Sequence, residues 1–179
     1  EGACVLVLET LESAQRRGAR IYAEVLGYGV SCDASHITAS DVNGIARAIR
    51  MAHEMAGVRP EQIDYISAHG TGTILNDLNE VKAIREVFGD HLPPISSIKS
   101  MIGHSFGAAS AIGLAACALA ITRGFIPPTI NHLVPDPELD IDCVPNIARE
   151  CELNIVQNNA FAFGGNNAIV ILGRNSNGA

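Results

Sequence analysis

The stretch from Ser105 to Thr122 contains no charged side chain, and most of its residues favour a helix. A helix that is apolar on every side must be buried, either inside a protein or in a lipid bilayer. This stretch contains Gly, Ser and Thr, and it lacks the Trp and Tyr residues that commonly flank a membrane span. We therefore expect a buried core helix and no membrane association.

The composition is that of a globular protein with a well-filled interior. Of 179 residues, 47% are hydrophobic and 17% are charged, which argues against disorder. The net charge of -7 argues against a nucleic-acid-binding protein, which usually carries a basic face. The five cysteines form no C-x-x-C pair and are odd in number, so reduced thiols in the cytoplasm are expected.

Apolar runs alternate with helical patterns along the chain. Apolar residues fall at helical spacing from Val42 to Met55, between Asp41 as an N-cap and Gly57 as a stop. A second helix is expected from Asn76 to Phe88. Strands are expected at 19–31, 63–67, 95–98, 153–161 and 167–173, of which the last two can form a hairpin. Strands separated by helices of ten or more residues predict crossover connections and a mostly parallel sheet.

The opening segment A-C-V-L-V-L (3–8) is a continuous apolar run, which is typical of a strand buried on both faces. A buried strand as the first element predicts that the chain is a fragment of a longer one.

The motif G-H-S-F-G (103–107) fits the G-x-S-x-G pattern of a serine hydrolase. That fold needs an acid and then a His downstream of the nucleophile. The only His after Ser105 is His132, and no Asp or Glu lies between them. The triad cannot be assembled in this order, so we expect Ser105 in the first turn of the buried helix, capping free N–H groups.

Two histidines lie at predicted strand-to-helix junctions. His69 follows a strand and precedes Gly-Thr-Gly-Thr, and His104 precedes the apolar helix. In open α/β sheets, ligands bind at the edge where strand C-termini point, so the two can converge on one pocket. Each alone could equally be a structural histidine in a turn. Thr71 and Thr73 add two hydroxyl groups beside His69.

Lys99 lies in an apolar stretch and needs an acidic partner, because burying an unpaired charge is costly. Asp77 and Glu80 are candidates, although D-x-x-E at a helix start also resembles a capping box. A metal site built from His69, Asp77 and His104 is conceivable, but no H-x-H or H-x-x-x-H spacing supports it, and we predict none.

The glycine-rich segment F-A-F-G-G-N (161–166) is either a tight turn or the lid of an apolar cavity. Together with three other segments it resembles the β-ketoacyl synthases (ketosynthases) of the thiolase superfamily. The segments are AHGTGTILND (68–77), SSIKSMIGHSFGAASA (96–111), PPTIN (127–131) and NNAFAFGGNNA (158–168). The opening EGACVLVLE also resembles that family. The resemblance covers residues 1–173, leaving 174–179 as a frayed tail, and corresponds to the C-terminal half of such an enzyme.

The resemblance implies an α/β, thiolase-like half with a mixed, mostly parallel five-stranded sheet, covering helices and a buried apolar helix. It also implies an acyltransferase of fatty acid or polyketide biosynthesis that performs a decarboxylative Claisen condensation. His69 and His104 would polarise the malonyl thioester carbonyl, and His104 would donate from Nε2. Lys99 and Glu80 would organise the catalytic site.

The remaining family positions map onto Asp77 as structural support, Thr71 and Thr73 as contacts of the pantetheine arm, and Phe163 as the gate and oxyanion residue. No cofactor is implied, since substrates are carried on the phosphopantetheine of acyl carrier protein. The implied partners are that carrier protein, the N-terminal half and a second subunit in a homodimer or heterodimer.

Two departures from the family pattern matter. The nucleophilic Cys belongs to the N-terminal half, and none of the five cysteines here has the family's A-C-S context. Ala162 replaces the first Gly of the family's F-G-F-G-G loop, and its Cβ is expected to stiffen the gate. An alternative is a non-catalytic subunit similar to a chain-length factor, although such a scaffold has no chemical need for His69, Lys99 and His104.

Overall fold

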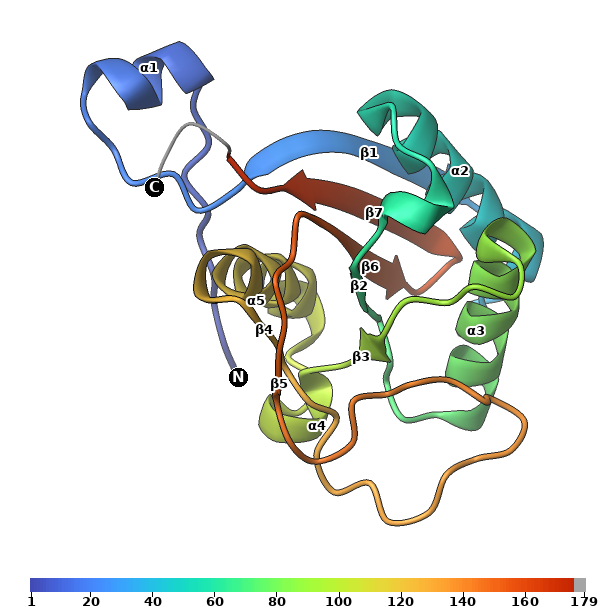
Figure 1. The fold of residues 1–179 in the computed structure, drawn as a ribbon. Coiled ribbons are helices and arrows are strands. Elements are labelled where there is room, and N and C mark those ends of the chain that lie inside the picture. Colours follow the sequence, from blue (N-terminus) through green and yellow to red (C-terminus); the bar gives the residue numbers. More distant parts are fainter. Residues whose placement is uncertain (176–179) are drawn as a thin grey trace.

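The computed structural model describes residues 1–175 and contains a five-stranded mixed sheet (Figure 1). Its strand order is β1 (Glu24–Cys32), β7 (Asn166–Gly173), β6 (Ile155–Ala162), β2 (Tyr65–Ser67) and β3 (Ile95–Ser96). Strand β7 pairs antiparallel with both β1 and β6, whereas β2 pairs parallel with β6 and β3. Four strands therefore run in one direction and β7 runs against them, which confirms the mixed, mostly parallel sheet and the C-terminal hairpin.

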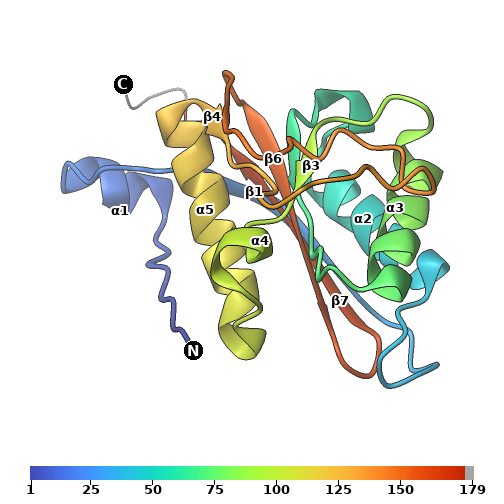
Figure 2. The same cartoon turned by 90° about the horizontal axis from the view of Figure 1, so that it is seen from below.

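Helices cover both faces of the sheet. Helices α2 (Val42–Ala56) and α3 (Ile74–Phe88) lie on one face, and α5 (Ala109–Arg123) lies on the other (Figure 2). The short α4 (Lys99–Ile102) and the 3-10 turn Phe106–Ala108 precede α5, while a second 3-10 turn, Pro60–Gln62, precedes β2. Strands β4 (Phe125–Ile126) and β5 (Arg149–Glu150) pair separately, and α1 (Leu11–Arg16) lies apart from the sheet (Figure 1).

Helix α2 begins and ends where the sequence predicts. The Asp41 side chain accepts a hydrogen bond from Gly44 N, and Gly57 ends the helix in the left-handed conformation. The helix lies directly on β1 because that strand offers glycine beneath it. A Cβ on Gly29 would lie 2.0 Å from the carbonyl oxygen of Ala48, so only glycine permits this approach.

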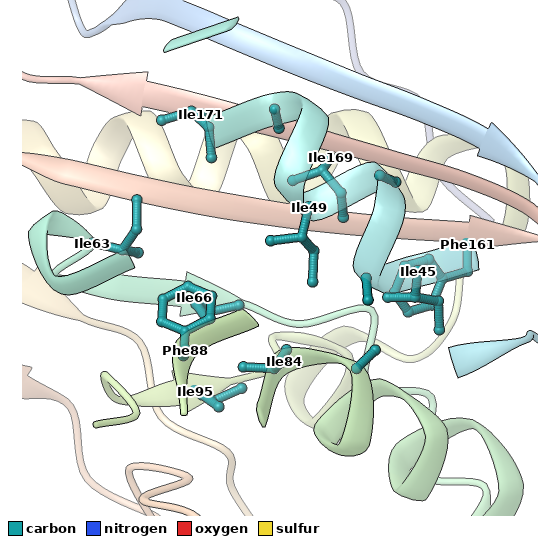
Figure 3. Packing of buried hydrophobic residues seen from close by; sticks show 14 residues of the cluster. Ile45, Ile49, Ile63, Ile66, Ile84, Phe88, Ile95, Phe161, Ile169 and Ile171 are labelled. Carbon is teal, nitrogen blue, oxygen red and sulfur yellow. The ribbon is translucent and has the colours of Figure 1, made fainter. Parts of the chain in front are cut away.

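The main hydrophobic core lies between the sheet and the α2–α3 layer (Figure 3). Its large members are Ile45, Ile49, Ile63, Ile66, Ile84, Phe88, Ile95, Phe161, Ile169 and Ile171. A second, smaller cluster lies between the sheet and α5 and includes Tyr65, Cys117, Ile121, Ile126, Leu153 and Val156. Because the two faces of β6 contribute to different clusters, its run of buried residues does not alternate with exposed ones.

Helix α5 is apolar on every side but is buried on one side only. Its buried residues are Gly113, Cys117, Ala120 and Ile121, whereas Leu119 is 42% exposed. By length and composition alone, Phe106–Arg123 could cross a membrane, a test that core helices also pass. The side of α5 that faces the sheet is therefore buried, as predicted. The opposite side stays exposed in this chain.

The predicted strand at 3–8 does not form. Residues 1–10 are irregular, and Val5 is 88% exposed. A strand requires a neighbour to satisfy its backbone groups, and none of the described residues pairs with this segment. The apolar pattern predicts burial, but these residues are mostly exposed in this chain.

Smaller corrections concern the ends of elements. The first sheet strand begins at Glu24 instead of residue 19, and α3 begins at Ile74 instead of residue 76. The expected tail at 174–179 is held at its start, because Arg174 N and Nε donate to the carbonyls of Asn154 and Leu153. The rest of that expectation, residues 176–179, lies outside the described part of the chain.

Candidate active site

The structure brings His69 and His104 together. His69 follows β2 and is almost fully buried, and His104 follows α4. Their ring centroids lie 5.4 Å apart at nearly a right angle, and the His69 ring also contacts Phe161 at 5.2 Å. Two segments that are far apart in sequence therefore present imidazoles to one place.

The hydrogen bonding of His104 indicates its tautomer. The backbone N–H of Phe106 donates to His104 Nδ1 at 3.1 Å, and the Phe106 ring stacks on the imidazole at 5.0 Å. Because Nδ1 accepts this bond, the proton of a neutral ring must be on Nε2. His104 can therefore donate from Nε2.

Both imidazoles are neutral at pH 7. Burial, followed by the charges of Lys99 and His104, lowers the pKa of His69 to about 3. Burial, followed by Lys99, also lowers the pKa of His104. Desolvation and the nearby ammonium group therefore both favour the neutral form of the two rings.

Glu80 anchors the backbone of the histidine loop. Its carboxylate accepts hydrogen bonds from His69 N (2.8 Å), Gly70 N (2.9 Å) and Asn159 Nδ2 (2.9 Å). Burial raises its pKa, and these three donors partly offset that effect. The capping-box interpretation is wrong, because Glu80 lies beyond the first turn of α3 and binds the preceding loop instead.

Asp77 and the two threonines lie at the start of α3. The N-cap is Thr73, whose hydroxyl pairs with that of Thr71 at 2.8 Å and does not cap the helix. Asp77 lies in the first turn and accepts a hydrogen bond from Asn76 Nδ2 at 3.0 Å. Burial raises the pKa of Asp77, and the Asn76 amide opposes that rise.

Lys99 forms no contact ion pair within residues 1–175, but the two predicted acidic partners, Glu80 and Asp77, are the charges that act on it. Burial lowers its pKa, while the charges of Glu80 and Asp77 raise it from a longer distance. The ammonium group is therefore compensated by the field of two carboxylates and not by contact with either.

Two neighbouring cavities meet at Lys99. A cavity of about 1030 Å³ lies between α3, α4 and the loop at 132–145, and it is lined by His104, Lys99, Asp77 and Thr71. A second cavity of about 310 Å³ is lined by His69, Lys99, Phe106, Phe161 and Asn158. Lys99 lines both, so the site extends to either side of this residue.

Phe163 lies in the turn between β6 and β7 and is 65% exposed. It lines neither cavity. The turn uses positive φ at Gly164 and Gly165, whereas Ala162 ends β6 without positive φ. Because Ala162 does not need a positive φ angle, its Cβ gives no reason to expect the turn to be stiffer.

Sequence reasoning missed three polar residues beneath the site: His53, Gln157 and Asn159, all of them buried. The signal available was the run Gln-Asn-Asn within an otherwise apolar strand. Buried amides require hydrogen-bond partners, so such a run predicts a polar network inside the core.

Other candidate groups do not form sites. Within residues 1–175, no three His, Cys, Asp or Glu side chains are grouped to hold a metal ion. The Ser105 hydroxyl is buried with no hydrogen-bond partner and does not cap a helix, so that expectation is wrong. Without a base in hydrogen-bond reach, Ser105 also lacks the activation that a serine nucleophile needs.

We expect acid to destabilise the complete protein through His69. The folded pKa of about 3 lies below the ordinary value of 6.5, so between these values the unfolded chain binds a proton that the folded one does not. Between pH 6 and pH 4, wild-type protein should lose up to about 1.4 kcal/mol per pH unit more than His69→Gln. Urea unfolding at several pH values measures this difference, and parallel curves for the two proteins would contradict it.

Comparison with known proteins shows the family to which this chain is similar. Residues 22–132 match the family described as "Beta-ketoacyl synthase, C-terminal domain". The chain is 51% identical over 172 residues to nodulation protein E of Rhizobium meliloti. It is 48% identical over 176 residues to 3-oxoacyl-[acyl-carrier-protein] synthase 2 of Staphylococcus aureus. These alignments cover 95% and 96% of this chain and 43% of each relative.

Solved structures show the same fold. The ishigamide ketosynthase/chain length factor superposes with a TM-score of 0.92 at 61% identity, covering 94% of this chain and 42% of that one. A type II PKS ketosynthase in complex with its acyl-carrier protein superposes with a TM-score of 0.91 at 38% identity, with the same coverage.

The chain belongs to the β-ketoacyl synthase family and comprises its C-terminal domain. The predicted thiolase-like half is thereby confirmed. The chain spans about 43% of the length of the curated relatives it matches.

Proposed function

We propose that this chain is the C-terminal half, over residues 1–173, of an enzyme that condenses an acyl thioester with malonyl-acyl carrier protein. One observation carries the proposal: two neutral imidazoles face one place, and one of them has its proton on Nε2. Neutral N–H donors held in place stabilise negative charge that develops on a thioester oxygen, without reorganisation during the reaction.

In the proposed reaction, an acyl group is first carried on a Cys of the other half. His69 and His104 donate hydrogen bonds to the malonyl thioester oxygen. The bond between the malonyl carboxylate and the α-carbon breaks, CO₂ leaves, and the electron pair forms an enolate. The α-carbon then attacks the acyl thioester carbon, and the Cys thiolate leaves. No metal or cofactor takes part in this scheme.

The other site residues receive supporting roles. Lys99, with Glu80 and Asp77, sets the electrostatic field around the histidines. Thr71, which is half-buried, and Thr73, which is exposed, offer their hydroxyls to the pantetheine arm. Phe163, exposed on its turn, serves as the gate, and its backbone N–H donates to the acyl oxyanion. The β6–β7 turn is hydrogen-bonded to residues 33–37, since Gly164 N donates to Ile37 O.

An exposed apolar surface supports the proposal that a second half packs against this chain. On the sheet face that carries α5, Tyr28 and Val30 are more than half exposed, as is Phe106 beside the helix. Large exposed apolar areas indicate an interaction surface. We propose that the N-terminal half covers it, within a cytoplasmic homodimer or heterodimer that receives substrates from acyl carrier protein.

A second candidate is a non-catalytic subunit of a ketosynthase heterodimer. One observation favours it: the structure of 61% identity is named as a ketosynthase/chain length factor, a name that covers both kinds of subunit. The presence of His69, Lys99 and His104 favours the catalytic subunit, because a scaffold has no need for all three.

The test is a condensation assay of the complete protein with an acyl-acyl carrier protein and malonyl-acyl carrier protein. We expect CO₂ release and a product longer by one C₂H₂O unit, detected by mass spectrometry of the carrier protein. A protein that stays inactive alone but restores turnover when paired with a separate ketosynthase subunit would support the non-catalytic alternative instead.

A further inference from the structure

A chain of four buried polar side chains crosses the core beneath the histidine loop. His53 Nε2 of α2 lies 2.7 Å from Gln157 Oε1. Gln157 Nε2 donates to Asn159 Oδ1 at 2.8 Å, and Asn159 Nδ2 donates to Glu80 Oε1 at 2.9 Å. Residues two apart on a strand share a face, so Gln157 and Asn159 connect the helices α2 and α3 across β6.

The hydrogen bonds in this chain can run in one direction only. The Glu80 carboxylate accepts two backbone N–H bonds, so the side chain of Asn159 must present its NH₂ group to it. The Asn159 oxygen then faces Gln157, which must present its own NH₂ group. The Gln157 oxygen in turn requires a proton on His53 Nε2.

The protonation state of His53 fits the donor role that the Gln157 oxygen requires. Its Nδ1 is buried without a hydrogen-bond partner, which suits an unprotonated nitrogen better than an N–H donor. Burial lowers the pKa of His53, and the Gln157 hydrogen bond opposes that effect only in part. The ring also meets Phe88 edge-on at 5.4 Å. His53 is therefore a neutral donor held in one orientation.

The stability of the fold does not explain why these four buried side chains are polar. Apolar residues of similar volume fill a core at least as favourably, because polar groups must be desolvated before they pair. A fully paired network instead fixes geometry, since each member has one permitted orientation. This network ends on the carboxylate that holds the backbone N–H groups of His69 and Gly70.

We propose that His53 and Gln157 are positioning residues of the condensation site, acting through Asn159 and Glu80 to fix the backbone at His69 and hold its ring against His104. This inference rests on the proposed function. Neither residue touches the substrate. Their loss displaces the His69 donor, and displacement of about 1 Å can slow a reaction up to 100-fold.

The experiment uses the complete protein and compares Gln157→Met, His53→Leu, His53→Gln and the double variant His53→Leu/Gln157→Met. We expect Gln157→Met and His53→Leu to lower the kcat of condensation about 10-fold, with the KM for malonyl-acyl carrier protein and acyl loading within about two-fold of wild type. His53→Gln keeps an N–H donor and should retain most of the activity. The double variant should match Gln157→Met, because both break one network.

Ile49→Val is the matched control for general loosening of the core. It lies one turn before His53 on α2, packs in the main hydrophobic core and makes no side-chain hydrogen bond. It should lower Tm by about 3 °C and leave kcat unchanged.

Three results would overturn the proposal. The first is wild-type kcat in Gln157→Met, and the second is equal loss in His53→Gln and His53→Leu. The third is a loss in Ile49→Val as large as in Gln157→Met. If Gln157→Met does not fold, the comparison of the two His53 variants decides the matter. A complete wild-type protein that does not condense overturns the proposed function, and this inference with it.

Discussion

Replacing His104 by Ala in the complete protein is expected to lower the rate of condensation about 10³-fold, while acyl loading stays within about two-fold of wild type. The imidazole supplies an Nε2–H donor whose orientation is set by the Phe106 N–H on Nδ1. In the proposed reaction, that donor acts on charge that develops during decarboxylation, and acyl transfer to the Cys does not require it. Single-turnover assays of acyl loading and of CO₂ release measure the two steps separately.

His91→Ala is the control for this prediction. His91 is exposed and lines neither cavity, so both steps should be unchanged. Equal loss of acyl loading and condensation in His104→Ala would contradict the proposed role. A smaller loss in condensation, of only a few fold, would show that His69 alone supplies the stabilisation.

The second large effect is a loss of unfolding free energy when Glu80 is replaced. Glu80→Leu leaves three donors without an acceptor: His69 N and Asn159 Nδ2, which are buried, and Gly70 N, which is partly buried. Removing one partner of a buried polar network costs the desolvation of the groups that remain, here about 3–5 kcal/mol of unfolding free energy. Urea unfolding of the complete protein measures it, and Glu80→Gln, which keeps one acceptor oxygen, should lose less.

Glu86→Leu on the same helix is the matched control. Its carboxylate is exposed and lies 3.5 Å from the guanidinium group of Arg50. Exposed ion pairs contribute about 0–1 kcal/mol, so this variant should unfold almost as wild type does. If Glu80→Leu is no less stable than Glu86→Leu, the three hydrogen bonds do not anchor the histidine loop.

Local patterns were the most predictable part of the fold. Asp41 and Gly57 define α2 because capping depends on a few neighbouring residues. The run at 3–8 was misjudged, because an apolar pattern indicates burial without saying which chain provides it. The same reason applies to α5, one side of which stays open in this structure.

The sequence was enough to predict which residues form the candidate site. It was not enough to predict which of their groups are in contact. Placing His69 and His104 after neighbouring strands was enough to expect convergence. Glu80 acts on Lys99 through its charge, as expected, but without contact, because its oxygens accept backbone N–H groups that a sequence does not display. His53 was missed for a related reason, since its partner Gln157 lies on a strand far along the chain.

By itself, the sequence determined where most helices and strands form, which side chains could carry chemistry and the family to which the chain belongs. These properties depend on neighbouring residues or on motifs of contiguous letters. Only the tertiary structure decided which groups meet: the two imidazoles 5.4 Å apart, the carboxylate beneath them and the amide chain that reaches it. Hydrogen bonds and desolvation depend on distances between remote segments, and those distances are set by packing of the sheet against its helices.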